Sequence, residues 1–272
     1  MDWQSLSTHD HARLRFAEAL LPLGTVEAHD GGPVGTDNLI PLGLCSRLSE
    51  RLKMPALPLM PYGLTQSLLA YPGGCTLSAE TLQRVLLDLA RSLARHGLAR
   101  LFVINGHGGN TAVLREAAAR LAAEDRMCVA IIDWWWEVQK EAKELFGEEG
   151  MGHAAIDEMA MLLGLYPELR ARIPAGVVPS YYCYKGVQAY PAPRPVMTYE
   201  RAGERVDFAR LDPERCTRFA DLVTDRVAQM IVDIRSGWLE IGKPPVRQAR
   251  KRSQGIAKKA AQRSAKKKPR RR

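Results

Sequence analysis

The stretch that decides the fold reads Leu101-Phe102-Val103-Ile104-Asn105-Gly106-His107-Gly108-Gly109-Asn110. Its first four residues are all apolar, which predicts a strand that is buried on both faces. The loop that follows is rich in glycine, so its backbone can approach a ligand closely, and it places His107 just beyond the strand. A ligand-binding loop at the carboxyl end of a buried strand is typical of α/β proteins.

Helices and a further strand are predicted around this stretch. Apolar residues recur at helical spacing over 78–97, where Ser78 can cap the start of the helix and Gly97 can end it. A second helix is expected over 110–125, and a strand over 128–133. The alternation of strands and helices predicts an α/β sandwich around a largely parallel sheet.

The flanking segments carry weaker signals. Short apolar runs lie at 19–23 and 57–60, and the first of them is broken by Gly24. Residues 170–200 are rich in Pro, Tyr and Val, which favours loops or an irregular hairpin, whereas helical spacing returns from 213 to about 234.

The basic charge of the chain is concentrated at its C-terminal end. The 272 residues include 39 Lys and Arg against 30 Asp and Glu, a formal net charge of +9. Residues 243–272 hold 14 of these basic residues and no acidic one, so residues 1–242 hold 25 basic and 30 acidic residues. We predict one domain over 1–242 and a disordered basic tail over 243–272, because the tail has almost no large apolar side chain to bury. This distribution argues against a folded domain with a basic nucleic-acid-binding face.

Membrane and exported proteins are not expected classes. No apolar run is long enough to span a bilayer, and the start, Met1-Asp2-Trp3-Gln4, lacks the basic and apolar regions of a signal peptide. The five cysteines are odd in number and far apart, which fits neither a disulfide framework nor a metal knuckle. We therefore expect a cytoplasmic protein with reduced cysteines and no membrane partner.

Three loops concentrate side chains that can bind a metal ion. In chain order they carry Glu27, His29, Asp37, His107, His153 and Glu158. The first two are two residues apart and point the same way in an extended chain. Apart from His153, the set mixes nitrogen and oxygen donors suited to zinc, manganese or iron, with enough carboxylates for two divalent ions and a bridge between them.

Each motif alone allows a simpler interpretation. A histidine after a strand is often only a hydrogen-bonded loop residue, and His153 could merely cap its helix. The glycine-rich loop could cradle a phosphate, but it lacks the Lys and Ser/Thr of a P-loop and the GxGxxG spacing. The combination of the three loops favours a metal site.

The order of these motifs resembles the creatininase family of metal-dependent amidohydrolases. The matching pieces, over roughly residues 20–165, are Gly24-Thr25-Val26-Glu27-Ala28-His29, Gly35-Thr36-Asp37, Tyr62-Gly63, Tyr71-Pro72-Gly73-Gly74, Asn105 to Asn110 and His153-Ala154-Ala155. The resemblance implies a three-layer α/β/α sandwich and the metal ligands Glu27, His29, Asp37 and His107, with Asp37 as the bridge. It implies Glu158 as a fifth ligand or as a group that supports one, because some members carry a carboxylate where this chain has Gly109.

The chain also departs from the family pattern. The loop between His29 and Asp37 is one residue shorter than usual, Ile156 stands where the family has a glutamate, and Met159-Ala160 replaces a Thr-Ser pair. These changes suggest a reshaped and more apolar substrate pocket.

The resemblance implies amide hydrolysis by a hydroxide that bridges the two ions, while one ion polarises the carbonyl. We expect His153 to act as general acid, because imidazole titrates at about pH 6.5 and can accept and return a proton. Glu158 is the second catalytic candidate. The predicted substrate is a small-molecule amide cleaved at a non-peptide C–N bond, either a cyclic amide such as creatinine or a formamide-type linear amide.

Further expectations concern the pocket and the partners. The substrate-binding candidates are Tyr62, Thr65, Tyr71, Trp134 and Trp135. Consecutive tryptophans cannot share one face, so some of residues 134–136 should pack in the core or an interface.

The resemblance implies a homo-oligomer. The alternative function is binding of nucleic acid or an acidic partner through 243–272, non-specific and salt-sensitive, although the tail could equally be a solubilising extension.

Overall fold

The structure is a computed structural model that describes residues 1–147, 152–179 and 205–241. The chain divides into two units, Met1–Arg235 and Ser236–Arg272, and the described part of the second unit is the helical segment 236–241. The predicted tail over 243–272 lies outside the described residues, as does most of the irregular segment predicted over 170–200.

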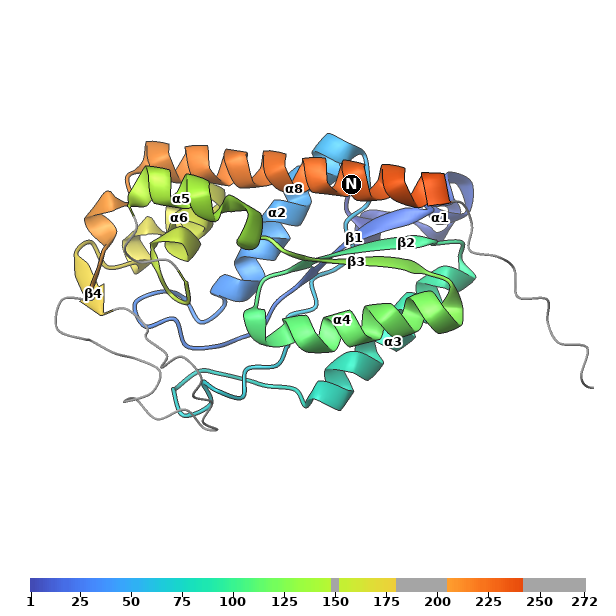
Figure 1. The fold of residues 1–272 in the computed structure, drawn as a ribbon, viewed down its shortest axis with the longest axis horizontal. Helices are drawn as coiled ribbons and strands as arrows, with labels where there is room; N and C mark the ends of the chain where they lie inside the picture. The colour runs from blue at the N-terminus through green and yellow to red at the C-terminus, as the bar shows by residue number, and fades with distance from the viewer. Residues whose placement is uncertain (148–151, 180–204, 242–272) are drawn as a thin grey trace, which may run out of the picture. The chain divides into compact units, whose positions relative to one another are not determined.

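A parallel sheet of three strands forms the centre of the first unit (Figure 1). Its strands are β1 (Glu18–Leu23), β2 (Arg100–Asn105) and β3 (Cys128–Asp133), in the order β1-β2-β3. The register aligns Leu23, Asn105 and Asp133 at the carboxyl ends. The loops that follow the strands therefore emerge at one edge of the sheet.

Helices and short turns make up most of the remaining described chain. The helices are α1 (Thr8–Leu14), α2 (Thr36–Leu52), α3 (Ala79–Arg95), α4 (Thr111–Arg120), α5 (Gln139–Phe146), α6 (Ile156–Leu165) and α8 (Pro213–Ile241). Two short antiparallel strands, β4 (Val177–Pro179) and β5 (Arg205–Asp207), pair with each other. Among the described residues, no helix is both long and apolar enough to cross a membrane.

Both faces of the sheet are covered by helices, which confirms the predicted α/β sandwich. Alternate strand residues such as Leu21 and Val103 belong to a buried core with α3 and α4 on one face. Leu20, Phe102 and Ile104 are buried on the other face, where α2 and α8 lie (Figure 1). Strands covered on both sides must be apolar throughout, which explains the unbroken apolar run in β2.

Helix α2 was missed by the sequence pattern. Its buried side chains, which include Ile40, Leu44 and Leu48, face the core, and α2 packs against β1. Pro41 lies inside the helix and has no amide hydrogen to donate to the carbonyl of Asp37. The loop after β2 lies against this carbonyl, because a Cβ on Gly106 would be 2.0 Å from it. Glycine is therefore required at position 106.

The apolar run 57–60 lies beside β1 without forming a regular strand. The amides of Leu57 and Met60 donate to the carbonyls of Leu20 and Pro22, at 2.8 and 3.0 Å. Pro58 between them has no amide hydrogen, so the hydrogen-bond ladder cannot be continuous.

The buried core on the α3 side should contribute strongly to the stability of the domain. Leu86 is fully buried in α3, whereas its neighbour Val85 is 41% exposed. We expect Leu86→Ala to lower the free energy of unfolding by about 2–5 kcal/mol, because it leaves a cavity, and Val85→Ala to cost less than about 1 kcal/mol. Urea unfolding of both variants measures the difference, and equal losses would contradict this packing.

Candidate metal centre

The six metal-capable residues predicted from the sequence meet at the carboxyl edge of the sheet. Glu27 and His29 come from the loop after β1, and Asp37 lies in the first turn of α2. His107 follows β2, while His153 and Glu158 come from the turn before α6 and from its first turn. Their donor atoms form overlapping groups of three, each within 4.8 Å: Glu27 with His29 and His153, Glu27 with Asp37 and His107, and His29 with Asp37 and Glu158.

The Asp37 carboxylate lies between two imidazole rings. Its Oδ1 is 3.1 Å from Nε2 of His29, and its Oδ2 is 3.0 Å from Nδ1 of His107. Each histidine also has a second carboxylate beside it. Glu158 Oε2 is 3.4 Å from His29 Nε2, and Glu27 Oε1 is 3.0 Å from His107 Nδ1. Asp37 thus faces two separate donor groups with its two oxygens.

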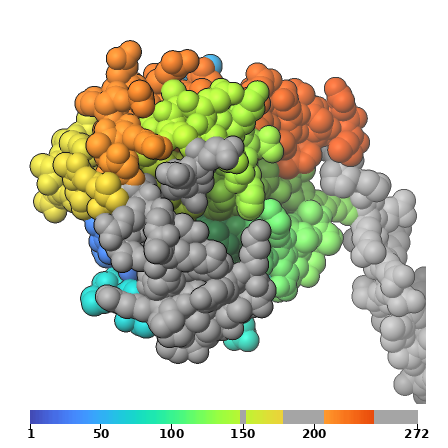
Figure 2. Space-filling view, turned by 60° about the vertical axis from the view of Figure 1, so that its left-hand side comes forward, coloured from blue at the N-terminus to red at the C-terminus, as the bar shows by residue number. Residues whose placement is uncertain are grey.

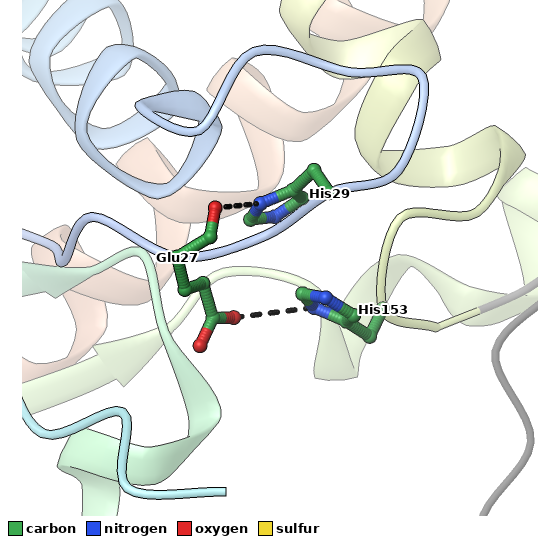
Figure 3. A group of neighbouring side chains, drawn as sticks. All are labelled: Glu27, His29 and His153. Carbon is green, nitrogen blue, oxygen red and sulfur yellow. Dashed lines mark hydrogen bonds and ion pairs between the residues drawn. The ribbon is translucent and has the colours of Figure 1, made fainter. Parts of the chain in front are cut away.

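His153 approaches Glu27 from the other side of the cluster. Its Nδ1 lies 3.2 Å from Glu27 Oε1, and its ring centre lies 4.4 Å from that of His29 (Figure 3). The turn that carries it is held by the next helix, because Glu158 Oε2 accepts the amide of Ala154 at 2.7 Å and Asp157 Oδ1 accepts that of Gly152 at 3.1 Å.

A backbone carbonyl orients each of the three histidines. The ring nitrogens that donate are Nδ1 of His29 to Glu27 O at 3.1 Å, Nε2 of His107 to Leu64 O at 3.0 Å and Nε2 of His153 to Ala28 O at 2.7 Å. A ring that donates from one nitrogen presents the other nitrogen as a metal ligand. In all three rings this second nitrogen faces the carboxylates.

The buried oxygens of the cluster need a positive charge. Glu27 Oε1 and Asp37 Oδ2 are buried and have no hydrogen-bond donor among the described residues. A lone pair on His107 Nδ1 would face both oxygens at 3.0 Å, which is favourable only if a proton or a metal ion lies between them. The donor set therefore fits divalent metal binding.

The titration of the cluster follows from its charges. Burial alone would lower the pKa of His107, but the carboxylates of Glu27 and Asp37 raise it to about 10. Burial also opposes charging of His29, yet Asp37 and Glu158 raise the pKa of this ring well above its usual value. The two imidazoles in turn hold the pKa of Asp37 below its usual range despite its burial. Burial and the neighbouring Glu158 raise the pKa of Asp157 to about 7.

The amide side chains of the glycine-rich loop hold neighbouring loops together, a role that the sequence did not indicate. Asn105 donates to His107 O and to Asp133 Oδ1, at 2.8 and 2.7 Å. Asn110 accepts the amide of Leu64 at 2.7 Å and donates to Gly24 O at 3.1 Å. The two asparagines of the glycine-rich loop therefore join the loops after β1 and β2 to the segment at 64.

A cavity of about 550 Å³ opens beside the cluster. Its wall includes Glu27, His107, His153 and Glu158 on the side of the metal-capable residues, and Trp135 is also part of it. In the space-filling view the surface is hollowed beside α5 (Figure 2).

The predicted substrate-binding residues have different environments. Trp135 lines the cavity. Trp134 is only 2% exposed, and its ring packs edge-on against the ring of Trp135. Thr65 is buried and its hydroxyl donates to Oε2 of Glu27, so it orients a metal-capable carboxylate. Tyr62 is half exposed, and neither it nor Tyr71 is among the residues that line this cavity.

Comparison with known proteins agrees with this geometry. The family model "Creatininase: Creatinine amidohydrolase" matches residues 1–231. The chain belongs to the creatininase family. The resemblance drawn from the sequence motifs is therefore confirmed, and the family is one of hydrolases that includes creatinine amidohydrolase.

Several creatininase relatives show how far the similarity extends. Creatinine amidohydrolase of Pseudomonas putida is 30% identical over 168 residues, which is 55% of this chain and 65% of that protein. A mycofactocin precursor peptide peptidase of Mycobacterium ulcerans is 32% identical over 182 residues, 62% of this chain and 68% of the relative. A solved manganese creatininase shares the fold with a TM-score of 0.72 at 23% identity, covering 90% of this chain and 99% of that one.

Metal binding should displace protons from this site. Because the pKa of His107 is raised to about 10, its ring is protonated at neutral pH when no metal is bound. We expect the affinity for Mn²⁺ to rise about tenfold per pH unit for each proton displaced, and to level off above about pH 10. Calorimetry in buffers of different ionisation enthalpy counts the released protons, with His9→Ala on exposed α1 as control. An affinity that does not change between pH 6 and 9 would contradict the assignment.

Proposed function

We propose that this chain is a binuclear metal-dependent amidohydrolase that cleaves a non-peptide C–N bond in a small-molecule amide. One observation carries the proposal: the two oxygens of the Asp37 carboxylate face two different histidines, each with a second carboxylate beside it. A single carboxylate between two donor groups is an arrangement that can bridge a pair of divalent ions. We propose that this hydrolase domain spans residues 1–242.

Two ligand sets follow from these contacts. Glu27, Asp37 and His107 would hold one ion, and His29, Asp37 and Glu158 would hold the other. Mixed imidazole and carboxylate ligands suit zinc, manganese or iron. When bound, the ions would supply an activated water and polarise the carbonyl of the substrate.

The position of Glu158 is supported by the shape of the glycine-rich loop. A Cβ on Gly109 would lie 2.4 Å from both His107 Nε2 and Leu64 O, so a side chain there would disturb the hydrogen bond that orients His107. A carboxylate on this loop is therefore unfavourable in this chain. Glu158 comes instead from α6, where its Oε2 lies 3.4 Å from His29 Nε2 and accepts the amide of Ala154 at 2.7 Å.

His153 is the proposed general acid and base. It lines the cavity, its side chain is 22% exposed, its Nε2 donates to Ala28 O, and its Nδ1 lies 3.2 Å from Glu27 Oε1, where it can accept and return a proton. Proton transfer to the departing nitrogen completes cleavage of an amide, because an amide anion is a poor leaving group.

The size of the cavity supports a small substrate. Its volume of about 550 Å³ lies within the range of roughly 300–1,000 Å³ that is common for small-molecule sites. Creatinine-like cyclic amides and formamide-type linear amides are therefore the proposed substrates. Some relatives are peptide peptidases, so short peptides are the competing substrate class.

Removing the bridging carboxylate should abolish both metal binding and activity. We expect wild-type protein to hold two equivalents of metal and to hydrolyse one member of a panel of creatinine, small lactams, formamides and short peptides. Asp37→Ala should lose at least one ion and about 10³-fold or more in kcat/KM, because both ligand sets share Asp37. Elemental analysis and initial rates measure these changes, with Asp88→Ala, at an exposed position of α3, as control. Full activity after chelation would overturn the proposal, and activity on peptides alone would overturn the non-peptide assignment.

Replacing His153 should separate proton transfer from metal binding. We expect His153→Ala to lower kcat by about 10²-fold or more while two equivalents of metal remain bound. His9→Ala, in which an exposed histidine is replaced, should keep normal turnover. Loss of an ion from His153→Ala would make this residue a ligand instead, and near-normal turnover would exclude it from catalysis.

A further inference from the structure

The cavity wall formed by α5 has a side-chain pattern that the proposed chemistry does not use. Gln139 and Lys143 both line the cavity, and they are four residues apart on one face of α5. Ala142 and Phe146, each three residues further along, lie on the same side of the helix and are buried. This side of α5 therefore borders both the buried interior, through Ala142 and Phe146, and the cavity, through Gln139 and Lys143.

Lys143 differs from the other charged residues of its helix. Lys140 pairs with Glu144 at 3.8 Å, and Glu141 pairs with Arg226 of α8 at 2.6 Å. Within the described ranges, no carboxylate lies within 4.0 Å of the Lys143 ammonium group. Its positive charge is available to a group that enters the cavity.

The charges around the cavity make this lysine significant. Among its described lining residues, Lys143 is the one lysine or arginine, and the acidic lining residues are Glu27, Asp157 and Glu158. Glu27 and Glu158 belong to the metal-capable cluster, and Asp157 accepts the amide of Gly152. A carboxylate in the cavity that does not reach the metal-capable cluster would therefore find its cationic partner on α5.

We propose that Lys143, with Gln139, binds a carboxylate on the substrate and so selects acidic amides. The inference rests on the proposed amidohydrolase function and narrows its substrate class. The carboxylate meant here is already present in the substrate and is distinct from the one that amide hydrolysis produces. Lys143 donates a charge-assisted hydrogen bond to it, and the Gln139 amide donates a second bond to the same group.

The proposal explains selectivity by differential binding. A neutral analogue of the same shape cannot pair with Lys143, so it gains less from entering the cavity than the charged form. Because Lys143 does not belong to any metal-capable group, its loss should weaken substrate binding without changing metal content.

Two pairs of probes test this selectivity. Succinamate and glutaramate each carry one carboxylate and one amide, whereas succinamide and glutaramide replace the carboxylate by a second neutral amide. Dissociation constants are measured by calorimetry on the full chain loaded with Mn²⁺. We expect at least one acidic probe to bind about tenfold more tightly than its neutral partner.

Variants of α5 identify the residue responsible. Lys143→Gln should remove the preference for the acidic probe, with its affinity falling about tenfold and that of the neutral probe changing less than about twofold. Lys143→Arg should retain the preference because it keeps the charge. Lys140→Gln is the matched control, since Lys140 carries the same charge on the same helix and does not line the cavity. For a probe that is hydrolysed, KM should rise in Lys143→Gln while kcat stays within about twofold.

The outcomes separate this inference from the proposed function. Equal binding of both probes in each pair, or an acidic preference that survives Lys143→Gln, would overturn the role of Lys143. Failure to bind either acidic probe at about 10 mM would overturn it as well. The proposed function is judged independently by metal content and by hydrolysis of the amide panel, so it can fail or stand whichever result the probes give.

Discussion

The arrangement of the site depends on the contact between one carboxylate and two imidazole rings. Asp37 lies in the first turn of α2, and its oxygens meet His29 and His107 from the loops after β1 and β2. The contact requires the start of α2 to lie directly on these loops. Gly106 allows this approach, since any larger residue there would collide with the Asp37 carbonyl. The register of the sheet, Gly106 and the position of the first turn of α2 therefore together allow the buried contact of Asp37 with the two histidines.

Burying this many acidic groups is costly unless positive charge accompanies them. Glu27 and Asp37 are almost completely buried, and the histidine beside both of them has its pKa raised to about 10. Hydrogen bonds from Thr65 and Asn105 contribute to the same network without bringing charge. The cluster is thus organised by neutral hydrogen bonds and balanced by protons or metal ions.

Much of the fold could be predicted from local patterns in the sequence. The contacts that hold the site residues in place could not be predicted in this way. The apolar run 101–104 and the helical spacing over 78–97 correspond to β2 and α3, because both are dominated by burial. Helix α2 was missed since Pro41 and the preceding glycines look like loop residues, although the spacing of Ile40, Leu44 and Leu48 could have revealed it.

The same limit applies to the residues around the metal-capable cluster. The motifs identified the histidines and carboxylates, because few other side chains bind metals at such spacing. The partners of these side chains come from distant parts of the chain, as Thr65 does for Glu27 and Leu64 for His107. Lys143 was also invisible in the sequence, since only the fold turns that face of α5 toward the cavity.

The carbonyl groups that hold the three imidazole rings have a consequence for how such a site can change. Glu27 O, Leu64 O and Ala28 O belong to the main chain, so no side-chain substitution at these positions deletes the acceptor. Substitutions at these three positions should therefore leave the orientation of the metal-facing nitrogens unchanged. The wall formed by α5 has no such constraint, because Gln139 and Lys143 belong to none of the metal-capable groups. Proteins with this fold can therefore change the α5 residues that line the cavity, and with them the substrate, while the metal-capable residues stay the same.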